Sequence, residues 1–173
     1  MSIVELGPED WQECRAIRLR ALADAPDAFS VMLVDAEQRP DELWREPLSL
    51  QGPTIAVRTA GGLVAMGGGY LSPEQPDVMM VWGMWTAPEA RGRGHARSLV
   101  SWLLDWARAH GISTVELHVT EGNDAARALY ESCGFVATGE WGSLREGSPL
   151  RIELLRRSST RASEDTQKPS LRS

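Results

Sequence analysis

Cysteine is scarce in this chain, and no long apolar run is present. Cys14 and Cys133 are the only cysteines among the 173 residues, which is too few for a disulfide framework or a cysteine metal site. No stretch reaches the roughly 18 apolar residues that a membrane span requires. The first residues also lack the basic and apolar segments of a secretion signal. These absences predict a protein of the reducing cytoplasm with no membrane partner.

Positive charge is not in excess either. The formal net charge is −6, so no basic face for nucleic acid is expected. The histidines, cysteines and carboxylates show no spacing typical of a metal site, and we expect no metal cofactor. The length fits one domain with a substantial core. We place this domain at residues 1–157. Residues 158–173 are rich in Ser, Thr, Arg and Glu with a single Leu, and are predicted to form a disordered or loosely attached tail.

Hydrophobic periodicity predicts alternating groups of strands and helices. Strands are expected over 3–6, 54–59, 63–71, 77–85, 114–120, 135–139 and 150–155, and helices over 8–23, 40–48, 96–109 and 124–132. The segments 25–39 and 141–149 show little periodicity. This order predicts an α/β (α+β) fold: a mixed, mostly antiparallel sheet of about seven strands with helices on both faces. The strand–helix–strand connection from 77 to 120 makes the two central strands parallel.

Three consecutive glycines, Gly67 to Gly69, lie inside the second strand of the predicted antiparallel meander. Glycine weakens a strand because it offers no side chain to pack. The run therefore predicts a bulge, or a close approach of another group to the backbone.

The turn between the strand 77–85 and the helix 96–109 is rich in glycine and arginine. A strand, a glycine turn and a helix start present unpaired N–H groups and partial positive charge, which suits phosphate. The spacing is not Gly-x-x-x-x-Gly-Lys-Ser/Thr. It is not Gly-x-Gly-x-x-Gly either, because Arg97 occupies the third glycine position. What is present is Arg91-Gly92-x-Gly94-x-Ala96.

This turn resembles the Arg/Gln-x-x-Gly-x-Gly/Ala signature of the GNAT superfamily of N-acetyltransferases. A second match follows at the spacing typical of the family: Asn123-x-x-Ala126-x-x-Leu129-Tyr130-x-x-x-Gly134-Phe135. The resemblance covers residues 1 to about 156 and is strongest over 80–136. It implies a GNAT fold in which the central parallel strands splay apart, and acetyl-CoA as the donor substrate bound in the resulting cleft.

The resemblance also implies roles for the donor site. Pyrophosphate would be bound by backbone N–H groups of Arg91, Gly92, Arg93, Gly94, His95 and Ala96, with the side chains of Arg91 and Arg93. His95 is expected to turn outward rather than to act in catalysis. Arg97 would contact the adenosine phosphates or point to solvent, and the sequence leaves both open. Main-chain groups of Met84, Trp85 and Thr86 would hold the acyl-pantetheine, and one N–H would stabilise the oxyanion. Asn123 caps a helix, and the resemblance adds a contact to the pantetheine arm.

Tyr130 is the candidate general acid, because the departing CoA thiolate must take up a proton. A packed aromatic is the alternative role for this residue. The general base is harder to assign, since the strand 78–86 contains no carboxylate or histidine and Asp77 at its start is the nearest. The resemblance to ribosomal-protein N-terminal acetyltransferases points to His118, five residues before Asn123. Glu116 and a water chain remain as rivals. Cys133 is expected to be a buried small side chain rather than a nucleophile.

The resemblance thus implies an N-acetyltransferase that moves an acetyl group from acetyl-CoA to a primary amine by direct transfer in a ternary complex. Two alternatives are a non-catalytic acyl-CoA-binding regulatory module and a transferase of another acyl group. The acceptor is a small-molecule amine or a peptide or protein amine, and the protein is a monomer or homodimer. Residues 25–39 and 141–149 are expected to line the acceptor pocket. Acidic side chains there and nearby would suit a cationic amine: Asp27, Asp35, Glu37, Glu140 and Glu146.

Overall fold

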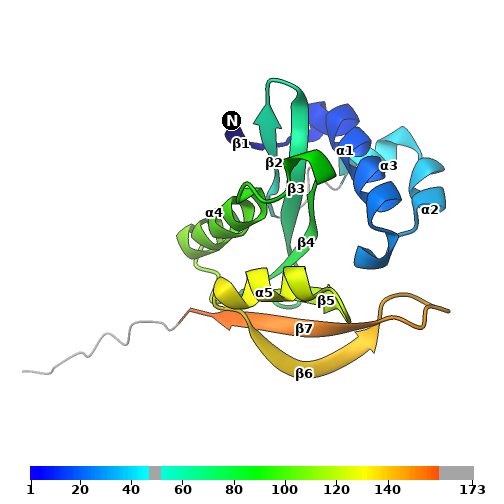
Figure 1. The fold of residues 1–173 in the computed structure, drawn as a ribbon. Coiled ribbons are helices and arrows are strands. Elements are labelled where there is room, and N and C mark those ends of the chain that lie inside the picture. Colours follow the sequence, from blue (N-terminus) through cyan, green and yellow to red (C-terminus); the bar gives the residue numbers. More distant parts are fainter. Residues whose placement is uncertain (47–51, 160–173) are drawn as a thin grey trace, which may run out of the picture.

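A computed structural model describes residues 1–46 and 52–159 of the chain, and Figure 1 shows the fold. One sheet of seven strands has the order β1-β2-β3-β4-β5-β7-β6. Its strands are β1 (Ser2–Glu5), β2 (Thr54–Thr59), β3 (Gly62–Leu71), β4 (Val78–Thr86), β5 (Thr114–Thr120), β6 (Val136–Ser143) and β7 (Arg151–Ser158). Only β4 and β5 pair in parallel, and every other pair is antiparallel. The predicted fold class is confirmed.

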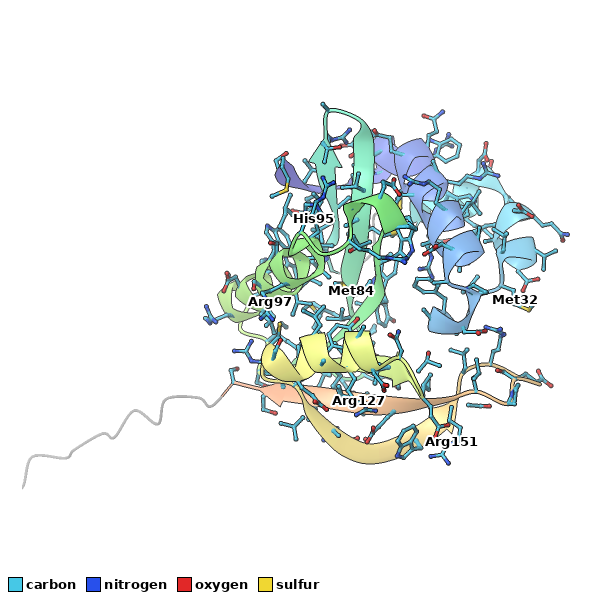
Figure 2. All side chains as sticks on the ribbon, viewed as in Figure 1. Met32, Met84, His95, Arg97, Arg127 and Arg151 are labelled. Atoms are coloured by element: carbon cyan, nitrogen blue, oxygen red, sulfur yellow. The ribbon has the colours of Figure 1, made fainter. Side chains whose placement is uncertain are left out.

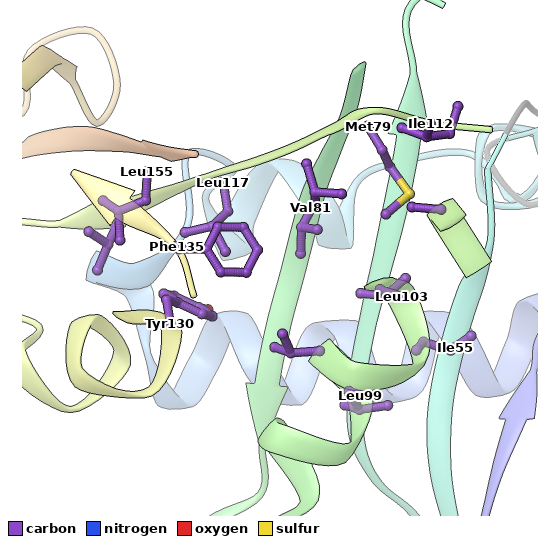
Figure 3. Close-up of a cluster of buried hydrophobic side chains, with 14 of the residues drawn as sticks. Ile55, Met79, Val81, Leu99, Leu103, Ile112, Leu117, Tyr130, Phe135 and Leu155 are labelled. Carbon is purple, nitrogen blue, oxygen red and sulfur yellow. The ribbon is translucent and has the colours of Figure 1, made fainter. Parts of the chain in front are cut away.

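Helices cover both faces of this sheet. The first face carries α1 (Trp11–Asp24), α2 (Leu33–Glu37) and α3 (Asp41–Arg45), with 3-10 turns at Pro8–Asp10 and Pro26–Ala28. The second carries α4 (His95–Ala109), preceded by a 3-10 turn at Pro88–Ala90, and α5 (Asp124–Ser132). Strand alternation divides the core between them: Ile55 and Val57 belong to the cluster under α4, and Ala56 belongs to the cluster under α1. Figure 3 shows Leu99 and Leu103 of α4 against the strands, and Tyr130 with Phe135 further along the same cluster.

The parallel pair is short, which opens the sheet in its middle. Only Val78, Met79 and Met80 of β4 pair with residues of β5, opposite Thr114 to Glu116. Beyond Met80 the two strands are no longer paired, and in Figure 1 β4 and β5 diverge beneath α5. The predicted splaying of the central pair is therefore confirmed.

The glycine run in β3 explains how β4 is shaped next to this opening. The β3–β4 register passes from Gly68–Trp82 to Met66–Trp85, so β4 carries a bulge at Gly83 and Met84. A side chain at Gly67 would place its Cβ 2.3 Å from the Met84 sulfur, and one at Gly68 would lie 2.5 Å from the Trp82 ring. Both consequences predicted for the glycine run, a bulge and a close approach, are present.

Two segments differ from the sequence prediction. Residues 141–143 continue β6 after a register shift between Ala137 and Trp141, an irregularity that hides strand alternation in the sequence. β7 runs on to Ser158 because Arg156 pairs with Val136 of β6 and Glu116 of β5. In the sequence, the polar residues at the end of β7 look like the beginning of the polar tail, so the predicted strand stopped at residue 155. Residues 47–48 of the predicted second helix and residues 160–173 of the predicted tail lie outside the described residues. In the described part, no helix is long and apolar enough to cross a membrane.

Candidate active site

The turn after β4 is built to leave backbone N–H groups free at the start of α4. Gly92 and Gly94 adopt positive φ angles of 73° and 80°, which residues other than glycine rarely adopt. Gly94 is the N-cap of α4 and offers no side-chain cap. The first-turn N–H groups of α4 therefore face outward without a side-chain acceptor, at the positive end of the helix dipole. This geometry suits an anion.

A cavity of about 590 Å³, here called the helix cavity, begins at this turn and extends between α4 and α5. Its lining includes most of the residues predicted to bind a donor substrate: Met84, Trp85, Thr86, Arg91, Gly92, Gly94, His95, Ala96, Arg97, Asn123 and Tyr130. Arg93 is exposed and does not line this cavity. In Figure 2, Met84 and Arg97 lie on either side of the space next to α5.

Two predicted side chains, those of Arg91 and Trp85, share a partner at the end of α1. Arg91 forms an ion pair with Asp24 at the end of α1, and its Nε donates to the Thr86 carbonyl at 3.0 Å. Asp24 also accepts from the Trp85 indole at 2.9 Å, and this bond, followed by the Arg91 contact, lowers the pKa of Asp24. The Arg91 side chain therefore holds the turn against α1 and β4. Asp24, which sequence reasoning missed, is fixed in this role only by tertiary contact.

The structure adds a contact for Arg97 and overturns the expectation for His95. Arg97 is exposed at the helix cavity, and its Nη2 donates to Ser132 Oγ at 2.8 Å, which ties α4 to α5. His95 was expected to turn outward, but it is only 5% exposed. It lies on the first turn of α4, where it packs inward, and its Nδ1 is buried without a hydrogen-bond partner.

A smaller cavity of about 230 Å³, the central cavity, occupies the opening between β4 and β5. Met84, Asn123, Ala126 and Tyr130 line both this cavity and the helix cavity, so the two meet there. Asn123 Oδ1 accepts from the Ala126 N–H at 3.3 Å, so the predicted helix-capping role is confirmed. His118 of β5 lines the central cavity only.

Tyr130 combines burial with access to both cavities. It is 7% exposed and makes an edge-on contact with Phe135 at 6.1 Å between ring centres. Burial raises the pKa of its hydroxyl to about 12, because the apolar surroundings disfavour the phenolate. The hydroxyl therefore keeps its proton at neutral pH and can donate it to a group in either cavity.

His118 and Glu116 lie on the same face of β5 but differ in what they can do. Partial burial by the cavity walls lowers the pKa of His118, and Glu116 offsets part of this effect. His118 is thus neutral at pH 7 and can accept a proton. Glu116 is buried and bonded to Arg156 Nε at 2.6 Å, and it does not line the central cavity. Glu116 is tied to Arg156, and His118 is the histidine that lines the central cavity, among whose described lining residues there is no carboxylate.

A third cavity of about 410 Å³, the apolar cavity, lies between the α1–α3 layer and strands β2 to β4. Residues of the segment 25–39 line it and the central cavity, and Leu144 from 141–149 lines the central cavity. None of the five acidic side chains expected at the acceptor pocket lines either cavity. Asp27 lies near Arg145 and Glu140 near Arg156. The acidic residues expected to suit a cationic amine therefore lie outside these two cavities. Charge counts along the sequence do not show which side chains turn inward.

No group of three or more histidine, cysteine or carboxylate side chains within residues 1–46 and 52–159 is arranged to hold a metal ion. Cys133 is a partly buried free thiol at the end of α5, beside Arg97.

A sheet that splays between two parallel strands, with a glycine turn leading into a helix beside the gap, defines a class of fold. The sequence pattern of the Acetyltransferase (GNAT) family matches residues 10–135, and the chain belongs to this family.

Relatives and solved structures agree with this assignment. The chain is 35% identical to the L-2,4-diaminobutyric acid acetyltransferase of Nocardia farcinica, over 46% of this chain and 41% of that protein. It is 37% identical to the mycothiol acetyltransferase of Thermobispora bispora, over 73% of this chain and 43% of that protein. It spans about two fifths of the length of these relatives.

Among solved structures, a GNAT-family acetyltransferase from Streptococcus pneumoniae has a TM-score of 0.78 at 21% identity, covering 91% of this chain and 99% of that one. The ribosomal-protein-alanine N-acetyltransferase of Brucella melitensis has a TM-score of 0.74 at 22% identity, covering 92% and 100%. At these identities the likeness concerns the fold.

Proposed function

We propose that this protein is an N-acetyltransferase that uses acetyl-CoA as donor and a primary amine as acceptor, with direct transfer in a ternary complex. The observation that carries the proposal is the meeting of two cavities at Met84, Asn123 and Tyr130. One cavity starts at an anion-binding helix terminus, and the other contains a neutral histidine. Relatives named as acetyltransferases of small molecules and a related fold solved with acetyl-CoA support the same conclusion.

The residues of the helix cavity fit a CoA-type donor. First-turn N–H groups of α4 would hold the pyrophosphate, as a helix N-terminus favours anions. The wall formed by Met84, Ala126 and Leu129 is apolar enough for a pantetheine arm, and Asn123 adds a polar contact at its side. Once bound, the donor supplies an activated acetyl thioester at the junction of the two cavities.

The protein's own residues then manage two protons. His118 takes a proton from the acceptor ammonium, directly or through water, since only the neutral amine is a nucleophile. Tyr130 holds a proton at its hydroxyl for the departing sulfur. In the overall change the nitrogen gains the acetyl group and loses a proton, the thioester C–S bond breaks, and CoA leaves as a thiol. Backbone N–H groups at the β4 bulge stabilise the carbonyl oxygen.

The test is thiol release from acetyl-CoA with a panel of acceptors: amino acids, polyamines, aminoglycosides, peptide N-termini and protein lysines. We expect release that depends on the amine, with an N-acetylated product detected by mass spectrometry. CoA binding by calorimetry with no release from any amine would instead support the non-catalytic acyl-CoA-binding module. Faster release from succinyl-CoA or propionyl-CoA would show that another acyl group is preferred.

A further inference from the structure

The apolar cavity adjoins the central cavity and is not needed for the donor. Arg18, Ser30, Met80 and Trp82 line both of them. The remaining wall of the apolar cavity is largely aromatic and aliphatic, with Trp44, Leu22, Met66 and Tyr70 among its residues. A ligand with its reacting nitrogen in the central cavity can therefore extend an apolar group into this space.

The charged side chains lining these two cavities are cationic or titratable to a cation. Arg18 and Arg39 line the apolar cavity, and Arg18 and His118 line the central one. No aspartate or glutamate is among the lining residues of either cavity. An acceptor that carried a second positive charge would meet no counter-charge here.

Among the residues that the structure describes, Arg18 has no hydrogen-bond acceptor and no ion-pair partner. Its Nη1 is buried without a hydrogen-bond acceptor, and its guanidinium forms no ion pair within the described part of the chain. Instead it lies over the Phe29 ring at 4.5 Å and beside Trp82 at 5.9 Å. Burial is the main cause that lowers the pKa of Arg18 to about 10, and Arg39 adds to the effect. A buried donor without an acceptor is costly. The indole N–H of Trp44, another lining residue, is also buried without an acceptor.

The position of Arg18 determines where an anionic group of a ligand would bind relative to the reacting atoms. Its Nη1 lies 3.4 Å from where a Cβ would stand on Gly83, the bulge residue next to Met84. The guanidinium thus lies beside the β4 bulge, on the wall of the central cavity. An anion bound there shares this cavity with His118.

From these contacts we propose that the acceptor is an α-amino acid with an apolar side chain. Its carboxylate would bind Arg18, its α-amine would lie in the central cavity beside His118, and its side chain would fill the apolar cavity. An arginine fork matches a carboxylate in shape and charge. This inference rests on the proposed acetyl transfer, which it deepens by naming the substrate class.

The test compares acceptors that differ only at the carboxylate. Phenylalanine, phenylalaninamide and phenethylamine form one series, and leucine, leucinamide and 3-methylbutylamine form another. Binding of each to the CoA-loaded protein is measured by calorimetry, and kcat/KM by thiol release. We expect the amino acid to bind about tenfold or more tighter than its amide or amine, as for a hydrogen bond to a charged group.

Arg18→Met should remove this preference, and Arg18→Lys should retain part of it because the charge remains. Arg58→Met is the matched control. Arg58 pairs with Glu13 of α1 on the outside and lines none of these cavities, so this variant should keep the full preference. Because the comparison of ligands on the unchanged protein stands alone, a variant that fails to fold leaves the conclusion testable.

Equal binding of the amino acid and its amide would overturn the inference, as would failure of every carboxylate-bearing amine to bind. Preference for peptide N-termini would also overturn it, because these lack an adjacent carboxylate. Thiol release from amines without carboxylate preference leaves the acetyltransferase proposal standing. Selective binding of amino acids without thiol release would support the amino acid as ligand and contradict the acetyltransferase proposal.

Discussion

At the scale of single residues, the site depends on side chains whose protonation is set by burial. Tyr130 of α5 lies where the two cavities meet and His118 of β5 lines the central cavity, and burial moves their pKa values in opposite directions. The phenol is held protonated and the imidazole is held neutral. This is the pair of states that a proton donor and a proton acceptor need at pH 7.

Replacing Tyr130 tests the donor. In Tyr130→Phe the ring and its contact with Phe135 remain, but the proton is lost. We expect kcat to fall about 100-fold, within the usual range for general acid catalysis, while the Kd for CoA by calorimetry is unchanged. Because the tyrosine pKa is about 12, kcat of the unaltered protein should show no alkaline decline from this group below pH 10. Unchanged turnover in the variant would remove the assignment.

The acceptor role of His118 predicts a pH dependence. Its pKa is lowered, so the neutral form persists below the usual value near 6.5, and activity is lost as pH falls through the lowered pKa. Below that pKa, the plot of log kcat/KM against pH should show the uptake of two protons, one by His118 and one by the amine. In His118→Gln only the decline caused by protonation of the amine should remain, and activity at neutral pH should be reduced about tenfold or more. His110→Gln, far along α4 and stacked on Trp106, is the control. A two-proton limb in His118→Gln would assign the base to another group or to water.

At the scale of elements, β4 and the turn after it carry the site because glycines permit their shapes. The side chains of Trp82 and Met84 lie directly over Gly68 and Gly67 of the neighbouring strand. Another residue in place of these two β3 glycines would clash with the side chains of β4. Residues other than glycine also rarely adopt the positive φ angles of the turn.

Adding one carbon to β3 should disturb this arrangement. Gly68→Ala would place a Cβ 2.5 Å from the rigid Trp82 ring, and overpacking of this kind costs about 1–3 kcal/mol. We expect a lower free energy of unfolding in urea and a weakened acceptor site. Gly61→Ala is the control, because the nearest atom to its Cβ is 3.8 Å away and φ is not positive. Equal stability of both variants would show that β4 can move aside.

Gly94 and Gly111 both have positive φ angles, so a comparison of their alanine variants distinguishes an effect on donor binding from an effect on stability. Gly94 (φ 80°) lines the helix cavity, and Gly111 (φ 72°) follows α4 at its other end. Neither would bring a Cβ within 4 Å of another atom, so alanine at either should cost about 1 kcal/mol through φ alone. Only Gly94→Ala should also raise the Kd for CoA several-fold, measured by calorimetry. Equal CoA affinity in the two variants would place the pyrophosphate elsewhere.

At the scale of the whole molecule, few backbone pairs join the two halves of the sheet. β4 and β5 share three paired positions, and the hydrophobic cluster under α4 and α5 spans both halves. On the other face, Arg145 Nη1 donates to the carbonyls of Pro26 and Phe29 at 3.1 and 2.9 Å. Thr120 Oγ1 donates to the Asp27 carbonyl at 2.8 Å. These bonds hold the segment after α1 against β5 and the loop of the C-terminal hairpin.

Cutting the Arg145 link should affect the acceptor more than the donor. In Arg145→Met we expect the KM for the amine to rise several-fold, because the wall containing Phe29 loses two hydrogen bonds, while the KM for acetyl-CoA changes little. Steady-state kinetics with each substrate varied in turn measure both. Arg151→Met is the control, since Arg151 lies over Trp141 on the same hairpin, away from this wall. A matching rise in both KM values would indicate general loosening of the fold instead.

The sequence alone predicted the seven strands, the longer helices and the family. Hydrophobic periodicity is a local property, so β5 and α5 were predicted with the bounds that they have. The short helix α2 lies in the segment 25–39, which shows little periodicity, and was not predicted. The glycine turn and the Asn123–Phe135 motif are also local, and they indicated the family. The β3 glycine run predicted a bulge or a close neighbour, and both are present.

Only the tertiary structure decided which side chains face the cavities and with what partners. Arg91 was expected to serve a ligand, and Arg97 a ligand or solvent, and both contact protein partners, Asp24 and Ser132. None of the acidic residues expected at the acceptor pocket lines the central or the apolar cavity, whereas Arg18 lines both. These outcomes depend on how α1 packs against β4, on residues distant in the chain. Helical spacing puts Arg18 on the same side of α1 as Cys14, Ala21 and Leu22, but it does not show which cavities the guanidinium lines. The lining of a cavity is a property of packing.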